Sequence, residues 1–309
     1  MKPVASVHHP GIHCTIQDFG RAGYRSMGVP AGGALDWISH YNANISLGNA
    51  ATKPTLEIIG SGLILKIMTY GHFSVFGAEM ELRINGVRHE LNQPHIMSPG
   101  DVISFGKQVR GHVNYLAIKG GFMADKMLGS AATLPRTNWG GLKGRILQKG
   151  DLLETVESDE AGTTQPIPLT DLEGEDIRFM VGPESSSESS WKLQEPLWRK
   201  GLFGDRIGHQ IENGSTIRLN THDIQSSPIA PGVIQLPASG QPIVLLNDSA
   251  STGGYARIGT IIAADLPRFC QIPPGKSFRL KEVSPEQALT ALKPYEMAFS
   301  LQQGFPISQ

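Results

Sequence analysis

The chain has 309 residues, with 27 basic and 28 acidic side chains and a formal net charge of -1. That balance gives no reason to expect nucleic acid or an anionic membrane as a partner. The 36 glycines and 21 prolines, with 18% charged residues, are typical of a turn-rich folded protein. The length suits one large domain or two of about 150 residues each.

Neither an apolar signal region nor a run of about 18 apolar residues is present in the sequence. The two cysteines, Cys14 and Cys270, do not indicate a disulfide framework. We therefore expect a cytoplasmic protein that binds no membrane.

Short strands separated by turns dominate the sequence. Asn85-Gly86 lies between two alternating runs, 80–84 and 87–91, and predicts a hairpin because both turn residues favour positive φ. Further strands are expected at residues 62–67, 73–76, 216–219 and 243–246. A tight turn precedes an apolar run at 99–103, 149–153 and 274–278, a recurrence that favours a β-barrel or sandwich.

Few helices are predicted. Residues 34–47 have apolar side chains near helical spacing, and Gly48 is placed to end that helix. Ser284 begins a second helix, with Pro285 in its first position and Gln287 closing a capping box. The polar segment 155–174 is rich in helix and strand breakers. It separates two predicted halves, 1–160 and 175–309, with 161–174 as the linker.

Three common kinds of site are not supported. Gly275-Lys276-Ser277 ends like a nucleotide-binding loop, but Cys270 replaces the required first glycine and a strand is expected to follow. His9 and His13 have the spacing of a helical metal pair, but Pro10-Gly11 between them argues against a helix, and we expect no metal. The G-x-S-x-G pattern of a serine nucleophile is absent.

Two polar clusters remain as candidates. The first, residues 14–37, is interpreted as a structured loop entering a helix, where Asp18 and Arg21 either form a structural pair or contact substrate. In the second, a buried strand at 243–246 delivers a set of polar residues and paired glycines into a loop, where backbone N–H groups approach an oxyanion. The alternative is a barrel corner in which Asp248 caps a turn and Tyr255 packs.

At these clusters the sequence resembles the family of C-type subunits of 5-oxoprolinase, also called the KipA or allophanate-hydrolase-subunit-2 family. The resemblance extends from about residue 11 to about residue 283. It rests on these blocks: TIQDFGRAGY (15–24), GVP (28–30), GALD (33–36), Asn44, LGN (47–49), LE (56–57), YLA (115–117), LGS (128–130), GPE (182–184), DR (205–206), GQPIVLL (240–246), TGGY (252–255) and ADL (264–266). Several polar positions of the family differ here; for example, Val113 replaces an arginine.

The resemblance implies a mainly β protein with a few helices, built from two cyclophilin-like β-barrel domains. It implies one subunit of an ATP-dependent 5-oxoprolinase, which opens the lactam of 5-oxoproline to glutamate. Its implied partners are a KipI-like B-type subunit, together with an A-type subunit. The relationship to urea carboxylase implies an alternative, one subunit of a biotin-dependent carboxyltransferase that acts on a small amide. A third alternative is a non-catalytic regulator that binds a KipI-like kinase inhibitor.

The resulting site hypothesis combines both clusters. Arg206 would bind a carboxylate or phosphate, Asp248 would orient substrate or act as a base, and the amides of Gly253 and Gly254 would bind an oxyanion. The predicted catalytic residues are Asp205, Arg206 and Asp248. The predicted substrate-binding residues are Thr252, Gly253, Gly254, Tyr255, Arg257, Gln17, Asp18 and Arg21.

Overall fold

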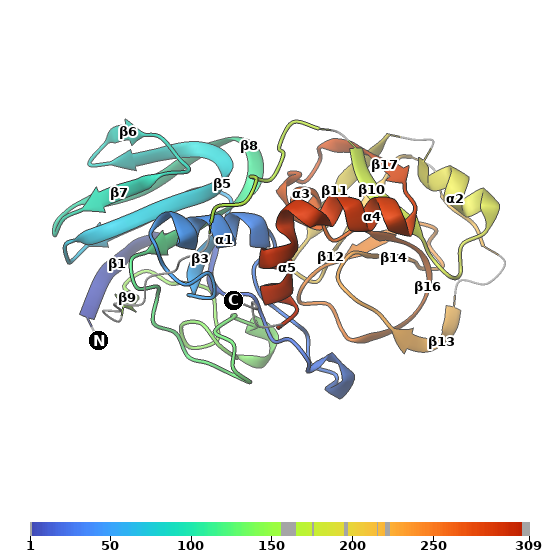
Figure 1. Ribbon diagram of the computed structural model, residues 1–309, viewed down its shortest axis with the longest axis horizontal. Coiled ribbons are helices and arrows are strands. Elements are labelled where there is room, and N and C mark those ends of the chain that lie inside the picture. Colours follow the sequence, from blue (N-terminus) through green and yellow to red (C-terminus); the bar gives the residue numbers. More distant parts are fainter. Residues whose placement is uncertain are drawn as a thin grey trace. The chain divides into compact units, whose positions relative to one another are not determined.

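The computed structural model describes residues 2–155, 165–174, 176–194, 197–214, 216–219 and 223–304, and in this part of the chain it is mainly β with a few short helices (Figure 1). Two compact units are present: unit 1 comprises Met1–Arg21, Gly32–Thr170 and Met297–Gln309, and unit 2 comprises Ala22–Ala31 and Asp171–Glu296. Each unit is therefore assembled from separate chain segments. Residues 161–164 of the predicted linker lie outside the described residues, and the predicted halves remain a prediction.

Unit 1 is built on an antiparallel sheet, nine-stranded in the described part of the chain. Its order is β2-β3-β8-β4-β1-β9, and β5 pairs with β8, β6 and β7. The strands are β1 (Lys2–Pro10), β2 (His13–Gln17), β3 (Thr55–Ile59), β4 (Leu63–Ile67), β5 (Gly71–Ile84), β6 (Val87–His89), β7 (Pro94–Met97), β8 (Val102–Ile118) and β9 (Leu152–Thr155). Their inward side chains, among them Leu56, Phe73 and Phe105, form one apolar core.

The sheet of unit 1 curves around the long strand β8 into a half-barrel. One edge of β8 pairs along its length with β5, while the other edge pairs with β4 at 102–104 and with β3 at 113–116. The sheet then ends at β2 and β9, which do not pair with each other among the described residues. The prediction of two barrels is therefore wrong for unit 1.

Two local predictions in unit 1 are confirmed. Asn85 and Gly86 have φ values of 52° and 82° and join β5 to β6 as the hairpin turn. Helix α1 (Trp37–Ser46) lies inside the predicted range and contacts β5 and β8, and Gly48 follows its end with φ 63°. The aromatic ring of Trp37 packs on Phe299 of α5 (Glu296–Gln302), 5.9 Å between centroids.

Among the described residues, unit 2 contains a closed seven-stranded barrel in the order β10-β17-β11-β12-β15-β14-β16, because β16 also pairs with β10 (Figure 1). Strand β13 extends the sheet beside β16. The strands are β10 (Asp176–Val181), β11 (Trp198–Gly204), β12 (Gly208–Glu212), β13 (Asp223–Pro228), β14 (Val233–Leu236), β15 (Ile243–Leu245), β16 (Thr252–Ile261) and β17 (Ser277–Glu282). The remaining elements are η1 (Arg25–Met27), η2 (Pro135–Thr137), α2 (Ser187–Gln194), α3 (Leu266–Gln271), α4 (Pro285–Leu292) and η3 (Lys293–Tyr295). The buried residues Phe179, Trp198 and Phe278 belong to the core of unit 2.

Two sequence predictions for unit 2 are wrong and one is confirmed. Residues 216–219 are not a strand, although Ile217 is buried and its N–H donates to the carbonyl of Gly240. Residues 252–255, predicted as a loop, begin β16, because their backbone pairs with β13. The capping box at Ser284 and Gln287 forms as predicted and starts α4.

Candidate functional site

The loop before α1 is held by the first of the polar motifs. Asp36 caps the helix, with Oδ1 accepting from the Ser39 N–H at 3.0 Å and Oδ2 from the Ser39 hydroxyl at 2.7 Å. Gly33 has φ 86°, and a Cβ there would lie 2.7 Å from backbone atoms of Phe19 and Gly20. Only glycine suits this position, because both its conformation and its space exclude a side chain.

Two further motif residues, Glu57 and Tyr115, bind the backbone that enters α1. Glu57 Oε2 accepts from the Leu35 N–H at 3.0 Å and from the Tyr115 hydroxyl at 2.6 Å. The Tyr115 oxygen in turn accepts from the Asp36 N–H at 2.8 Å. Burial, followed by the nearby Glu57 carboxylate, raises the pKa of Tyr115 well above its ordinary value. These motif residues therefore act as a buried scaffold in unit 1.

The predicted site residues Asp18 and Arg21 bind one loop, residues 127–132. Asp18 accepts from the Ser130 hydroxyl at 2.7 Å and from the Ala131 N–H at 2.6 Å. Arg21 donates to the carbonyl oxygens of Met127 and Ala132. Asp18 thus accepts hydrogen bonds from the loop, and Arg21 donates hydrogen bonds to it. These contacts support the interpretation that both residues have a structural role.

Gln17 lies on β2 and is fully buried. Its Nε2 donates to the Thr15 hydroxyl at 3.0 Å and to the Thr133 carbonyl at 3.2 Å. These bonds join β2 to the segment after the 127–132 loop. The contacts described for Gln17, Asp18 and Arg21 are thus with unit 1 itself, and their substrate contacts remain a prediction.

In unit 2, Arg206 and Asp248 form a buried ion pair. The guanidinium donates from Nε to Oδ2 at 3.0 Å and from Nη2 to Oδ1 at 2.9 Å, and the two side chains are 4% and 6% exposed. The Asp248 N–H also donates to the Arg206 carbonyl. Asp205 is exposed, and its Oδ1 accepts from the Ile207 N–H. The pair joins the turn before β12 to the loop after β15 and so has a structural role. Contact of the pair with substrate remains a prediction.

The predicted glycine-bearing loop is the first part of β16, with Gly253 opposite Ser227 and Thr252 opposite Pro228 of β13. Tyr255 is 43% exposed, so it is not packed as a core residue. Arg257, farther along β16, binds both oxygens of Glu184 at 2.9 and 2.6 Å, and Glu184 Oε2 also accepts its N–H. The GPE motif thus fixes Arg257 in place.

The sequence interpretation did not single out Arg25 and Gln235. Arg25, on η1, donates from Nη2 to the carbonyl of Ile229 at 2.6 Å and to that of Ala250 at 2.9 Å. Gln235 is a buried polar residue in the apolar strand β14. A lone amide in the run Val-Ile-Gln-Leu is a signal that could have identified it, whereas nothing local indicates the long-range contacts of Arg25.

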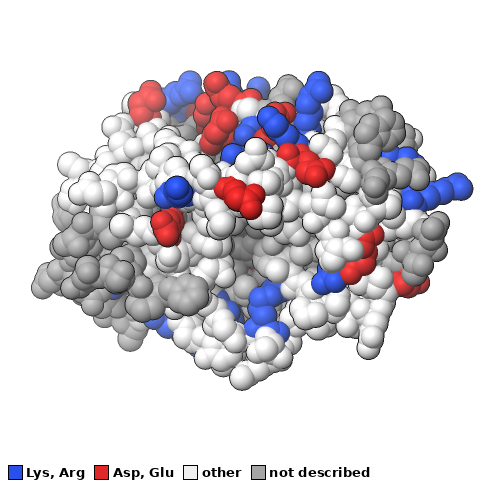
Figure 2. Space-filling model, turned by 45° about the vertical axis from the view of Figure 1, so that its right-hand side comes forward, with Lys and Arg blue, Asp and Glu red and all other residues white. Residues whose placement is uncertain are grey.

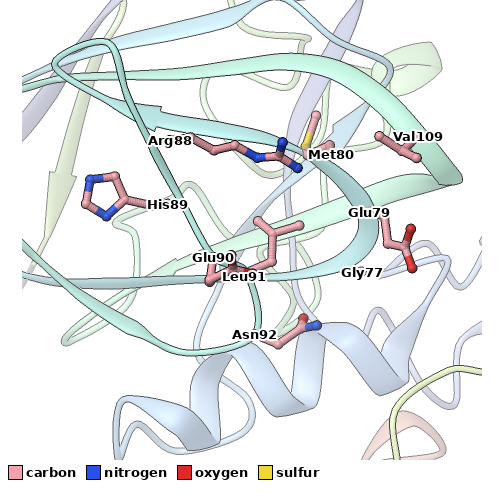
Figure 3. A pocket seen from close by; sticks show the side chains of 9 residues that line it. All are labelled: Gly77, Glu79, Met80, Arg88, His89, Glu90, Leu91, Asn92 and Val109. Carbon is pink, nitrogen blue, oxygen red and sulfur yellow. The ribbon is translucent and has the colours of Figure 1, made fainter.

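A separate cavity of about 310 Å³ opens in unit 1 between β5, β6 and β8. Figure 3 shows the guanidinium of Arg88 reaching toward Met80, while the ring of His89 points away. Glu79 and Glu90 also line the cavity, so charges of both signs are present. This mixture does not define a ligand class.

Within the described ranges, no group of three or more His, Cys, Asp or Glu side chains could hold a metal ion. None of the helices seen in this part of the chain combines the length and apolarity needed to span a bilayer. Figure 2 shows acidic and basic side chains intermingled along the upper part of one face, without a field of one sign.

Comparison with known proteins identifies the family. Residues 27–282 match the carboxyltransferase domain, subdomain A and B. The chain belongs to this carboxyltransferase domain family. It is 34% identical to the C-type subunit of 5-oxoprolinase from Escherichia coli over 94% of both chains, and 33% identical to that from Haemophilus influenzae over 89% of both.

The architecture of the carboxyltransferase domain agrees with this assignment. All of this chain superposes on the crystal structure of the K. lactis urea amidolyase, with a TM-score of 0.88 and 28% identity, but it corresponds to only 20% of that chain. The chain is therefore homologous to one subunit of an enzyme complex and related to a much longer amidolyase. The blocks quoted from the sequence include both scaffold residues, such as Glu57, and the strand that begins at Thr252.

Proposed function

We propose that this carboxyltransferase-domain protein is the C-type subunit of an ATP-dependent 5-oxoprolinase complex. The identity with the C-type subunits of two 5-oxoprolinases along nearly the whole chain is the observation that supports this proposal. The reaction adds water to the lactam carbonyl, breaks the ring C–N bond and protonates the nitrogen, which yields glutamate. The partners are a KipI-like B-type subunit, together with an A-type subunit.

ATP is proposed to be shared with the partner subunits, and the segment Gly275-Lys276-Ser277 of this chain does not form a nucleotide loop. Gly275 has φ 83° in a turn, and Ser277 then begins strand β17. A nucleotide loop would need a helix N-terminus at that place. No step of the mechanism is therefore assigned to ATP on this chain.

The substrate site is proposed at the start of β16, with the loop after β15 beside it. Thr252 and Tyr255 are exposed there, and Gly253 and Gly254 are half-buried. Arg206 and Asp248 order the adjoining loop as an ion pair. An amide substrate needs oxyanion stabilisation, which N–H groups at such a strand end supply. We also propose that the closed barrel of unit 2 is of the cyclophilin-like type.

The test is co-purification of the tagged chain with its partners, followed by an assay of 5-oxoproline-dependent ADP release. The A-type and B-type subunits should be recovered with the chain, and ADP release should require all three proteins and the lactam. Recovery of partners without lactam-dependent ADP release would contradict the 5-oxoprolinase assignment.

A second candidate function is that of one subunit of a biotin-dependent carboxyltransferase that acts on a small amide such as urea. The match to the carboxyltransferase domain and the likeness to the urea amidolyase support it. A biotin carrier would have to be another chain, because Lys126-Met127 lacks the preceding methionine of a carrier motif. Biotin-dependent carboxylation of urea by the purified complex would select this alternative.

A further inference from the structure

Segment 22–31 belongs to unit 2, although the residues on both sides of it belong to unit 1. Its own turns are closed by the N–H groups of Met27 and Val29, which both donate to the carbonyl of Tyr24. Among the described residues, the side-chain hydrogen bonds from this segment to the rest of the chain all come from Arg25. Arg25 is therefore the polar anchor of the segment.

Arg25 joins two other segments of unit 2 through one nitrogen. Its Nη2 donates to the carbonyl of Ile229 at 2.6 Å and to that of Ala250 at 2.9 Å. Ile229 follows β13, and Ala250 lies in the loop between β15 and β16. These two segments also bind each other, because the Ile229 N–H donates to the carbonyl of Ser251 at 3.0 Å. Arg25 thus fixes a junction of two backbone segments from a third.

The loop after β15, residues 246–251, is held by arginines at two places. Arg206 binds the carboxylate of Asp248 with two hydrogen bonds. Arg25 binds the carbonyl of Ala250, two residues farther along and two residues before β16 begins. The part of the loop that enters β16 is therefore the part that Arg25 holds.

Arg25 differs from the neighbouring arginines in the kind of group that it binds. Arg206 and Arg257 form ion pairs with Asp248 and Glu184, whereas the described residues give Arg25 no carboxylate partner. Hydrogen bonds from a charged donor are stronger than those between neutral groups, and a planar guanidinium restricts the direction of both carbonyls that it binds. The charge of Arg25 thus serves to orient two peptide groups.

We propose that Arg25 is a positioning residue that fixes the entry of loop 246–251 into β16. It acts through the carbonyls of Ile229 and Ala250 and contacts no reacting atom. The loop carries Asp248, and β16 begins with the glycines proposed to bind an oxyanion, so a displaced loop would misalign both. This consequence for turnover rests on the proposed function, whereas the fixing of the loop does not.

Hydrogen exchange followed by mass spectrometry tests the fixing of the loop on the full-length chain alone. In Arg25→Gln we expect the amides of 228–232 and 246–251 to exchange at least tenfold faster than in the wild type, because the bond between Ile229 and Ser251 loses its support. The amides of α3 should exchange at the wild-type rate. Arg199→Gln is the matched control, since Arg199 forms an exposed ion pair in the same unit.

Two results of this measurement would overturn the proposal. One is wild-type exchange of both segments in a folded Arg25→Gln chain. The other is an equal increase in α3, which would indicate loss of the whole fold rather than of one anchor. If Arg25→Gln does not fold, Arg25→Lys provides the same comparison, because it keeps the charge but replaces the guanidinium that binds both carbonyls.

Kinetics of the assembled complex test the consequence for turnover. Arg25→Gln should lower kcat for 5-oxoproline-dependent ADP release at least tenfold and leave KM within twofold, because the misaligned groups stabilise the transition state more than they bind the substrate. Arg25→Lys should recover most of the lost kcat, since it keeps a charged donor. Loss of stability alone would lower the amount of folded complex without this difference between kcat and KM.

The two measurements distinguish this proposal from the proposed function. Faster exchange of loop 246–251 with an unchanged kcat would overturn the role of Arg25 in turnover. A wild-type complex without lactam-dependent ADP release would contradict only the proposed function, and hydrogen exchange would still decide whether Arg25 fixes the loop.

Discussion

Tyr115 donates its phenolic hydrogen to Oε2 of Glu57 across 2.6 Å, and both side chains are fully buried in unit 1. The two residues are separated by 58 positions in the chain, on β3 and β8, and are paired across the sheet. Their bond continues to the N–H groups of Leu35 and Asp36, so the start of α1 is attached to the sheet through one carboxylate.

Removing the hydroxyl of Tyr115 should therefore destabilise unit 1. Tyr115→Phe leaves Glu57 and the Asp36 N–H each short of one partner, and we expect the free energy of unfolding to fall by about 2–4 kcal/mol. Urea unfolding followed by circular dichroism measures the difference. Tyr70→Phe is the control, because Tyr70 is 76% exposed in the same unit. Equal losses in the two variants would contradict a buried role for the hydroxyl.

Alanine substitutions at Gly33 and Gly23 distinguish the cost of a steric clash from the cost of backbone strain. Both have φ 86°, but a Cβ at Gly33 meets backbone atoms at 2.7 Å, whereas nothing lies within 4 Å of one at Gly23. Gly23→Ala should cost about 1 kcal/mol from its positive φ alone. Gly33→Ala should cost several kcal/mol or prevent folding, because the backbone must move. Thermal melting of both variants provides the measurement, and similar melting temperatures would show that the loop adapts.

The buried imidazole of His40 predicts a loss of stability in acid. His40 is fully buried, its Nδ1 lies 2.8 Å from the Thr55 hydroxyl, and burial lowers its pKa to about 3. The unfolded chain binds a proton near pH 6.5 and the folded chain does not, so stability is present above pH 6.5 and is lost as the pH falls toward 3. The slope is about 1.4 kcal/mol per pH unit, or about 3 kcal/mol by pH 4.5.

The variant His40→Asn keeps a donor near Thr55 but does not titrate. Urea unfolding between pH 7.5 and 4.5 should show the wild type losing about 3 kcal/mol more than this variant. Other groups titrate in both proteins and cancel in the difference. Parallel pH profiles would mean that His40 has the same pKa in the folded and the unfolded protein, and would contradict the prediction.

The ion pair of Arg206 and Asp248 allows a double-mutant test. Removing either partner leaves a buried charge, and we expect each of Arg206→Met and Asp248→Asn to cost about 3–5 kcal/mol. The double variant should cost less than the sum of the single variants. Arg199→Met, which breaks an exposed pair, should cost about 1 kcal/mol or less. If turnover of the complex is lost while stability is unchanged, the pair acts on substrate rather than on the fold.

Elements with local determinants were predicted well. The Asn85-Gly86 turn and the Ser284 capping box depend on residues within four positions of each other, so their energies can be judged from the sequence. Strand 216–219 and loop 252–255 were predicted wrongly. Whether a segment is a strand depends on a partner elsewhere in the chain, here β13 for Thr252.

The candidate site was predicted less well than the fold, because its residues also depend on partners elsewhere in the chain. Glycines at 253 and 254 indicated a loop, but Gly253 is in a strand because its backbone pairs with β13, and Gln235 and Ile229 occupy the space that a side chain there would need. Asp18 and Arg21 were identified as a pair, and the structure has both bound to the 127–132 loop, more than 100 residues away. Only the folded chain brings these segments together.

The sequence by itself determined the β-rich character, the local turns and caps, and the family to which the motif blocks belong, because these depend on local conformational preference and on residue order. The tertiary structure decided that one unit closes as a barrel and the other does not, since closure depends on whether β10 meets β16 and β2 meets β9. It also decided that Arg25 lies against Ile229, 204 positions away. Local conformational preference cannot predict a contact between residues so far apart in the chain. The contact forms only when folding buries the two segments against each other.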